Sequence, residues 1–241
     1  MKFKEFLNKA FLYLSVPKCV CCKERLSSTE STLCSECMRI AEESMGIECP
    51  VCLKKVKECK CESTHLESHF LKGHIKLYRY AHSEVSKPLD SLIYSLKRGE
   101  RDDVFELASD LLSKAVLAHG VPLENAYITN IPRRKTAIIR FGVDHARMLA
   151  KKVSEKLGIG YLEIFKSTTK TAQKHLRGVE RVKNADFSLL NEFDLTKKTV
   201  IIVDDVVTTG ASMGNAATLV RSMGAKNIYA LSIGSAYNKK S

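Results

Sequence analysis

The stretch from residue 200 to residue 212, Val-Ile-Ile-Val-Asp-Asp-Val-Val-Thr-Thr-Gly-Ala-Ser, constrains the fold more than any other part of the chain. Its first four residues are apolar and β-branched, which is typical of a strand buried on both faces of a sheet. Asp204 and Asp205 follow, then a loop of small residues and an apolar helical pattern that begins near Met213. This order predicts a site at the carboxyl end of a sheet strand, where open α/β folds bind ligands.

The chemistry of this stretch favours a phosphorylated ligand. Backbone N–H groups of the loop and of the following helix N-terminus attract an anion such as phosphate. The two carboxylates repel phosphate, but they suit hydroxyl groups or a divalent cation beside it. The alternative is a buried strand that ends in a helix cap, with the acids there by chance. That alternative does not explain the order of the whole stretch.

All nine cysteines lie between residues 19 and 61. In a cytosolic chain, clustered cysteines indicate metal ligands rather than disulfides. A tetrahedral zinc ion needs four thiolates about 2.3 Å from the metal, and two Cys-x-x-Cys pairs can supply them. We therefore expect a structural zinc bound by Cys19, Cys22, Cys34 and Cys37. Cys21 lies inside the first pair and is either a spare thiol or a replacement for Cys22.

A second group of cysteines has less regular spacing. We expect it to bind a second zinc ion through Cys49, Cys52, Cys59 and Cys61. A single residue separates the last two, and three nearby histidines can replace one ligand: His65, His69 and His74. Free thiols around a single metal, and crossed pairing of the four cysteine pairs, remain alternatives. Either way, we expect this small segment to need metal in order to fold.

Most of the net charge of +12 is concentrated in one window. Residues 131–183 hold 14 Lys plus Arg and four acids, for a net charge of +10. Beside an expected phosphate site, this concentration favours an anionic ligand, and pyrophosphate and single-stranded nucleic acid both fit. Residues 1–62 carry a net charge of only +2. We therefore expect the zinc module to serve structure or docking rather than electrostatic binding of nucleic acid.

Strand and helix patterns alternate along the rest of the chain. Strand patterns cover 69–80, 126–131, 161–165, 197–204 and 227–233, and helical patterns cover 89–94, 104–117 and 148–157. The polar, basic segment 166–187 is interpreted as a mobile lid, because loops of this length in compact domains are often functional. The alternation predicts an α/β fold with a doubly wound, mostly parallel sheet. The expected domains are residues 1–62, with an N-terminal helix and the zinc-finger module, and residues 63–241.

Residues 1–14 carry apolar residues at helical spacing, with lysines between them. Lys9 interrupts what would be the apolar core of a signal peptide, and no small-residue cleavage site follows. No apolar run reaches the length of a membrane span. We expect a short amphipathic helix packed on the body of a cytoplasmic protein.

The stretch 200–212 closely resembles the 5-phosphoribosyl-1-pyrophosphate (PRPP) motif of type I phosphoribosyltransferases. Other segments extend the resemblance to the ComF family, which is associated with DNA uptake in competent bacteria. The cysteine pairs resemble that family's zinc finger. The remaining matches are Tyr94–Gly99, Ile131–Arg134, Arg140–Ala146 and Gln173–Phe187. The chain departs from the family's usual Phe, Asn and Gln at Val143, Asp144 and His145.

The resemblance implies a PRPP site with Mg²⁺. The ribose hydroxyls would be held by Asp204 and Asp205. The 5′-phosphate would be bound by Val207, Thr208, Thr209, Gly210 and Ser212. The leaving pyrophosphate would lie near Arg133 and Arg134, with the lid supplying Lys166, Lys174 or Arg177. Cations placed there would stabilise the charge that builds on pyrophosphate, so the expected catalytic residues are Asp204, Asp205, Lys166 and Lys174.

Two functions follow from the resemblance. The first is a PRPP–Mg binding protein in DNA uptake and natural transformation, with single-stranded DNA and uptake machinery such as a helicase as partners. The alternative is an active phosphoribosyltransferase of nucleotide metabolism or salvage that acts on an unidentified acceptor. Aromatic residues on which bases could stack are sparse in the basic window, where they are Phe141, Tyr161 and Phe165.

Overall fold

The computed structural model describes residues 16–49, 52, 54–56, 59, 66, 70–79, 84–168 and 187–236. Its helices are α2 (Ser35–Gly46), α3 (Lys87–Arg98), α4 (Asp102–Ala118), α5 (Lys135–Phe141), α6 (His145–Leu157) and α7 (Ala211–Ser222). Its strands are β1 (Gly73–Arg79), β2 (Ala126–Asn130), β3 (Gly160–Tyr161), β4 (Phe165–Ser167), β5 (Phe187–Leu189), β6 (Thr199–Val207) and β7 (Asn227–Ser235). The expected N-terminal helix and the centre of the expected lid lie outside the described residues.

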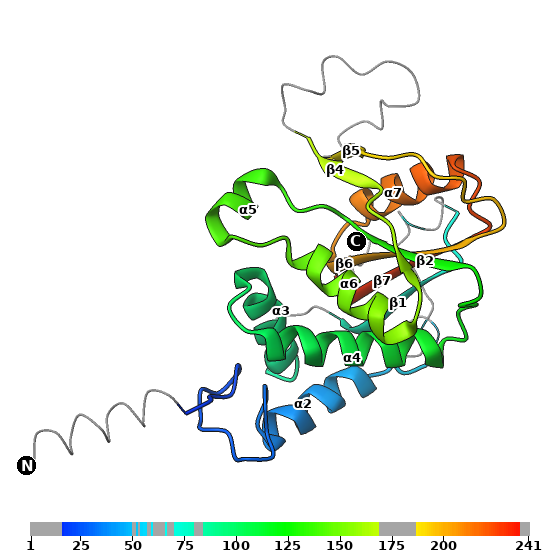
Figure 1. Cartoon of the computed structure of the whole chain (residues 1–241). Coiled ribbons are helices and arrows are strands. Elements are labelled where there is room, and N and C mark those ends of the chain that lie inside the picture. Colours follow the sequence, from blue (N-terminus) through cyan, green and yellow to red (C-terminus); the bar gives the residue numbers. More distant parts are fainter. Residues whose placement is uncertain are drawn as a thin grey trace, which may run out of the picture.

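A five-stranded parallel sheet forms the centre of the molecule, with the strand order β1-β7-β6-β2-β3. The β-branched run at the start of β6 occupies the central strand, where Val200, Ile201, Ile202 and Val203 are fully buried. Helices α3, α4 and α6 lie on one face of the sheet and α7 lies on the other (Figure 1). The predicted doubly wound α/β fold is therefore confirmed.

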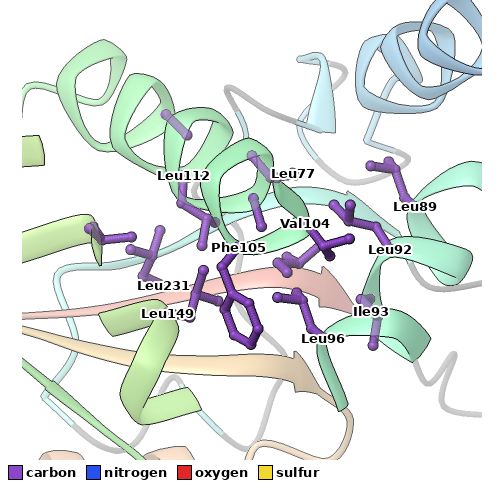
Figure 2. Packing of buried hydrophobic residues seen from close by; sticks show 14 of the residues in the cluster. Leu77, Leu89, Leu92, Ile93, Leu96, Val104, Phe105, Leu112, Leu149 and Leu231 are labelled. Carbon is purple, nitrogen blue, oxygen red and sulfur yellow. The ribbon is translucent and has the colours of Figure 1, made fainter. Parts of the chain in front are cut away.

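Side chains of alternate strand residues fill two separate cores. The larger core packs Ile201 and Val203 of β6 against α4 and α6, and Figure 2 shows Phe105 of α4 at its centre. The second core packs Val200 and Ile202 against α7. This alternation also decides which face each residue at the end of β6 points to, because successive side chains of a strand point to opposite faces.

The cysteine-rich module is packed onto the sheet domain through the larger core. That core is continuous from Leu33 and Ala41 of the module to Leu89 and Leu92 of α3. Arg101 reinforces the contact, because its guanidinium donates to the carbonyl oxygens of residues 18 and 31 at 2.6 and 3.0 Å. The domain boundary at residue 62 stays a prediction.

Two segments differ from the sequence expectation. The strand pattern at 161–165 is divided, because β3 ends at Tyr161 and the chain then leaves the edge of the sheet. Phe165 instead begins β4, which pairs antiparallel with β5 in a separate two-stranded sheet. The Phe165 and Phe187 rings pack edge to face, with centroids 5.2 Å apart. The other difference is α5, a helix with no buried residue, which no apolar periodicity predicted.

Within the described residues, none of the helices combines the length and the apolar character needed to cross a bilayer.

Candidate ligand site and metal centres

The carboxyl end of β6 separates the two aspartates. Asp204 continues the row of Val200 and Ile202 and so points to the α7 face of the sheet, where it lines a small cavity of about 50 Å³. Asp205 continues the row of Ile201 and Val203 and points to the opposite face, toward α3 and α6. The two carboxylates are thus adjacent in sequence but have different surroundings.

The cavity beside Asp204 is formed by the loop between β6 and α7. It is lined by Asp204 and by residues 206–213. Gly210 stands at the N-cap of α7 with φ = 83°, a left-handed conformation that favours glycine and turns the loop into the helix. The first N–H groups of a helix have no partner within the helix. The loop therefore combines helix amides with the hydroxyls of Thr208, Thr209 and Ser212, which are suitable donors to a phosphate.

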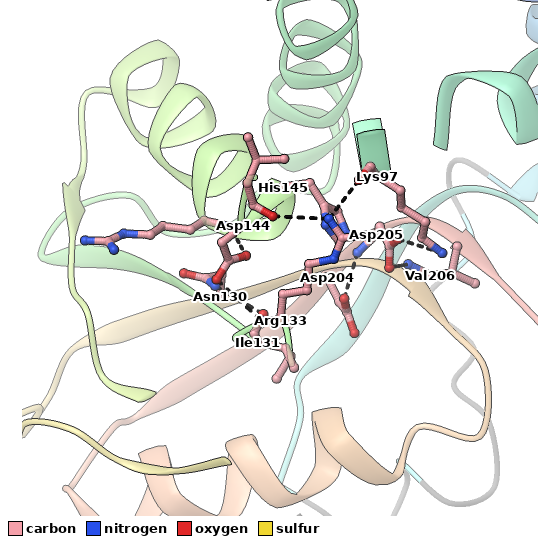
Figure 3. A network of polar contacts seen from close by, with 11 residues as sticks. Lys97, Asn130, Ile131, Arg133, Asp144, His145, Asp204, Asp205 and Val206 are labelled. Atoms are coloured by element: carbon pink, nitrogen blue, oxygen red, sulfur yellow. Dashed lines mark hydrogen bonds and ion pairs between the residues drawn. The ribbon is translucent and has the colours of Figure 1, made fainter. Parts of the chain in front are cut away.

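Asp205 is bound by two basic side chains from the other face of the sheet. Its Oδ2 lies 3.0 Å from Lys97 Nζ, at the end of α3, and 3.1 Å from His145 Nε2, at the start of α6 (Figure 3). Asp205 and His145 are 7% and 6% exposed. These two partners are functional candidates that the sequence reasoning missed. The alternation of apolar residues in β6 is the signal that could have placed Asp205 on their side of the sheet.

The surroundings drive the pKa values of the two carboxyls apart. Desolvation and the negative charge of Asp205 raise the pKa of Asp204 well above its usual range. Burial alone would also raise the pKa of Asp205, but the close contact and charge of His145 and the charge of Lys97 outweigh it. The pKa of Asp205 is therefore lowered. Neighbouring carboxyls whose pKa values are shifted in opposite directions are common at sites that bind charged ligands.

Arg133 follows β2 at the same edge of the sheet, and its side chain contacts other parts of the protein. Its Nη1 donates to the carbonyl oxygen of Lys97 at 2.7 Å and to that of Val143 at 3.1 Å. Its guanidinium lies 4.7 Å from the centroid of the Phe141 ring. Arg134 is exposed at the N-cap of α5. Arg133 thus fixes the ends of α3 and α6 to each other, which its sequence position alone did not reveal.

The expected lid residues are only partly within the described structure. Lys166 is exposed on β4, in the two-stranded sheet outside the main sheet. Lys174 and Arg177 lie outside the described residues. The roles assigned to these three residues stay predictions.

The first cysteine group has the geometry of a zinc centre. The sulfur atoms of Cys19, Cys22, Cys34 and Cys37 all lie within 4.8 Å of one another, and Cys22 and Cys34 are 3.7 Å apart. Four thiolates about 2.3 Å from a tetrahedral zinc ion would lie about 3.8 Å apart, so the group fits this ion. Burial opposes ionisation of Cys19, but hydrogen bonds from the backbone of Cys34, Cys22 and Cys21 lower its pKa to about 7. Cys21 itself is not part of the group.

The second cysteine group brings Cys49, Cys52 and Cys59 within the same distance of one another. The remaining candidates Cys61, His65 and His69 lie outside the described residues. His74 is not part of the group, because it is buried in the sheet and its Nε2 lies 2.8 Å from Ser232 Oγ. The suggestion that His74 replaces a cysteine ligand is therefore wrong. The described cysteines also show that the pairs do not cross between the two groups.

Comparison with known proteins agrees with the arrangement at the end of β6. A family model described as a phosphoribosyl transferase domain matches residues 136–237, which include β6, the loop and α7. The crystal structure of adenine phosphoribosyltransferase from Saccharomyces cerevisiae is 19% identical, with a TM-score of 0.38, and the match covers 57% of this chain and 71% of that chain.

Two curated relatives differ in how much of the chain they match. The ribose-phosphate pyrophosphokinase of Thermococcus kodakarensis is 30% identical over 150 residues, which cover 54% of this chain and about half (52%) of that protein. The DNA utilization protein YhgH of Escherichia coli O6:H1 is 27% identical over 230 residues, which cover 89% of this chain and 96% of that protein. The chain is thus similar to a phosphoribosyl transferase domain over residues 136–237 and to DNA utilization protein YhgH over most of its length.

Proposed function

We propose that this protein binds PRPP with Mg²⁺ at the carboxyl end of β6 and acts in DNA utilisation, the role named for its relative YhgH. The observation that carries the proposal is the cavity in which Asp204 faces the Thr208–Ser212 loop and the N-terminus of α7. In this arrangement the loop amides and hydroxyls bind the 5′-phosphate. Asp204 lines the same cavity, at the position that the ribose hydroxyls would occupy when the 5′-phosphate is bound to the loop.

The acidic pair suits a divalent cation. The pKa of Asp204 is raised because its carboxyl is desolvated and lies beside another negative charge, and a bound cation would relieve that cost. Mg²⁺ prefers carboxylate and phosphate oxygens, so Asp204 and the pyrophosphate of the ligand would hold it. When bound, it would neutralise charge on the pyrophosphate. Among the described residues, Arg134 and Lys166 have exposed, positively charged side chains, and we propose that they also neutralise charge on the pyrophosphate.

The test is calorimetric titration of the protein with PRPP in the presence and absence of Mg²⁺. We expect Mg²⁺-dependent binding that Asp204→Asn weakens by roughly ten- to a hundredfold, the loss typical of a hydrogen bond to a charged group. Asp194→Asn is the matched control, because Asp194 is an exposed carboxylate that accepts a hydrogen bond from the backbone N–H of Thr196 in its own loop. Equal affinity of wild type and Asp204→Asn would refute the site.

The proposed contact with single-stranded DNA rests on charge around α5. Residues 131–143 contain four cations and no acid: Arg133, Arg134, Lys135 and Arg140. The last three are exposed. A polyanion would bind here through its phosphates, releasing counterions, so the affinity would fall with salt. The name of the relatives, DNA utilization protein YhgH, supports a partner of this class.

Fluorescence anisotropy of a labelled oligothymidylate over a series of salt concentrations tests this contact. Replacing Arg134, Lys135 and Arg140 by alanine together should reduce the slope of log affinity against log salt by about 2, at roughly 0.7 for each lost contact. Lys152→Ala/Lys156→Ala is the control, because both lysines pair with acids on α4. A wild-type affinity that does not change with salt would exclude phosphate contacts.

The alternative function is active transfer of phosphoribose from PRPP to an acceptor. The same cavity supports it, and so does the similarity of residues 136–237 to a phosphoribosyl transferase domain. Pyrophosphate release from PRPP in the presence of candidate nucleobases distinguishes the two. Release that depends on both acceptor and Asp204 would establish a transferase, whereas Mg²⁺-dependent binding without release favours a PRPP-binding protein. The cytoplasmic location stays a prediction of the sequence.

A further inference from the structure

The second cysteine group repeats the local geometry of the first. In the first group, the backbone N–H of Cys19 donates to the carbonyl oxygen of Glu24 at 2.8 Å. In the second, the backbone N–H of Cys49 donates to the carbonyl oxygen of Lys54 at 2.7 Å, and an isolated β-bridge flanks each turn at the corresponding positions. The sulfur atoms converge in both groups. The shared geometry supports a thiolate-bound metal ion in the second group as well as in the first.

Two basic side chains of β1 lie against the second group. Arg79 Nη2 donates to Cys49 Sγ at 2.8 Å. Lys76 Nζ donates to the carbonyl oxygen of Cys59 at 3.0 Å, and negative charge on Cys59 or Cys49 attracts it. Lys76 is 1% exposed, and Cys49 and Cys59 are fully buried. Lysine is almost never buried to this extent unless its charge is paired, so negative charge on this group accounts for a lysine inside the protein.

A metal-loaded centre would bring net negative charge into this buried region. Three thiolates around one divalent ion leave one negative charge, and a fourth thiolate would leave two. A buried charge is costly unless an opposite charge lies beside it. Lys76 and Arg79 supply two positive charges at this place, so they favour the loaded centre and oppose the loss of metal. The hydrogen bond from Arg79 to Cys49 has a second effect, because a group that bonds to a metal ligand also fixes the orientation of that ligand.

We propose that Lys76 and Arg79 are positioning residues of a second metal centre, which neutralise its negative charge and hold Cys49 and Cys59 against the sheet. The metal is a divalent ion that prefers thiolates, such as zinc. In the described five-stranded sheet, β1 is an edge strand that pairs with β7 alone. The second centre therefore joins the cysteine module to this edge, at a place distinct from the contact of the module with α3. The inference goes beyond the binding of PRPP and does not depend on it.

Cadmium-113 NMR of the full chain, loaded with Cd²⁺ in place of zinc and titrated with a chelator, tests the proposal. We expect one signal for each cysteine group, and the signal of the second group is assigned by its loss in Cys52→Ser. In Lys76→Met and in Arg79→Met the second signal should disappear at a chelator concentration roughly ten- to a hundredfold lower than in wild type, the effect typical of removing a partner of a metal ligand. The first signal should keep its wild-type midpoint and so serves as a control within each sample.

Matched variants separate positioning from general effects of substitution. Lys72→Met removes the same charge from an exposed position just before β1 and should leave both signals unchanged. Arg79→Lys keeps the charge but not the planar guanidinium, so its loss should be smaller than that of Arg79→Met. Arg79 is partly exposed at the end of β1, so its variants carry the test even if Lys76→Met does not fold.

Melting temperatures measured with and without metal provide a second readout. A ligand that binds the folded protein raises its melting temperature according to its affinity, so the rise on adding Zn²⁺ should be smaller in Lys76→Met and Arg79→Met than in wild type. A merely structural role would instead lower both melting temperatures equally and leave the rise unchanged, which would overturn the proposal. Wild-type chelator midpoints in both variants, or a single cadmium signal from the wild-type chain, would overturn it as well.

Discussion

The contact between Gly99 and Val143 gives a prediction whose size follows from the structure. Gly99 ends α3 with φ = 68°, in the left-handed conformation, and lies against Val143. In Gly99→Ala the left-handed backbone costs about 1 kcal/mol. The new Cβ would lie 2.3 Å from Val143 Cγ2, so the side chain or the helix ends must move, which adds about 1–3 kcal/mol. The expected loss of unfolding free energy is about 2–4 kcal/mol.

Gly158 provides the matched control. It ends α6 with φ = 64°, and a Cβ at this position would meet no atom within 4 Å. Gly158→Ala should therefore lose only the backbone contribution of about 1 kcal/mol. The assay is urea unfolding followed by circular dichroism, with the slope against urea checked for each variant. Val143→Ala combined with Gly99→Ala should show a favourable coupling of about 1 kcal/mol or more, because it removes the clashing methyl groups.

Equal losses for Gly99→Ala and Gly158→Ala, with no coupling to Val143, would refute this reasoning. They would mean that the ends of α3 and α6 are not in firm contact. The position of Lys97 beside Asp205 would then lose its structural basis.

Three further outcomes follow from the same structure. Asp205→Asn should lower the melting temperature most at neutral pH and least below pH ~4. Because the pKa of Asp205 is lowered in the folded protein, its carboxylate stabilises the fold at pH values above the unfolded-state pKa. This stabilisation is lost as the pH falls through the folded-state pKa. Asp204→Asn should raise the melting temperature at neutral pH and leave it unchanged near pH ~3, because the raised pKa of Asp204 makes its ionised form unfavourable in the fold. Chelation of zinc, or Cys34→Ser, should lower the melting temperature of the whole chain, because the cysteine module shares its core with α3. Cys21→Ser should keep the wild-type zinc content, measured by elemental analysis, because Cys21 is not part of the first cysteine group.

Much of the fold could be predicted because its strongest signals are local. The β-branched run before Asp204 is the central strand, and the small-residue loop leads into α7 as expected. The start of α6 was placed at Met148 rather than at His145, because the capping role of Asp144 was not recognised. That signal was present, since aspartate is a favoured N-cap residue.

The features that were missed depend on contacts between distant segments. Strands β4 and β5 pair across a long intervening segment, and short strands of this kind have no pattern of their own. Helix α5 buries no residue, so no apolar face marks it. Lys97 and His145 reach Asp205 from the ends of two helices, and only the packed fold brings the three together.

A crystal structure grown with Mg²⁺ and PRPP is the most direct test of the central claim. We expect density for the 5′-phosphate at the amides of Thr208–Ser212, with the ribose beside Asp204. A well-ordered ligand bound elsewhere, or an empty cavity at saturating PRPP, would contradict it.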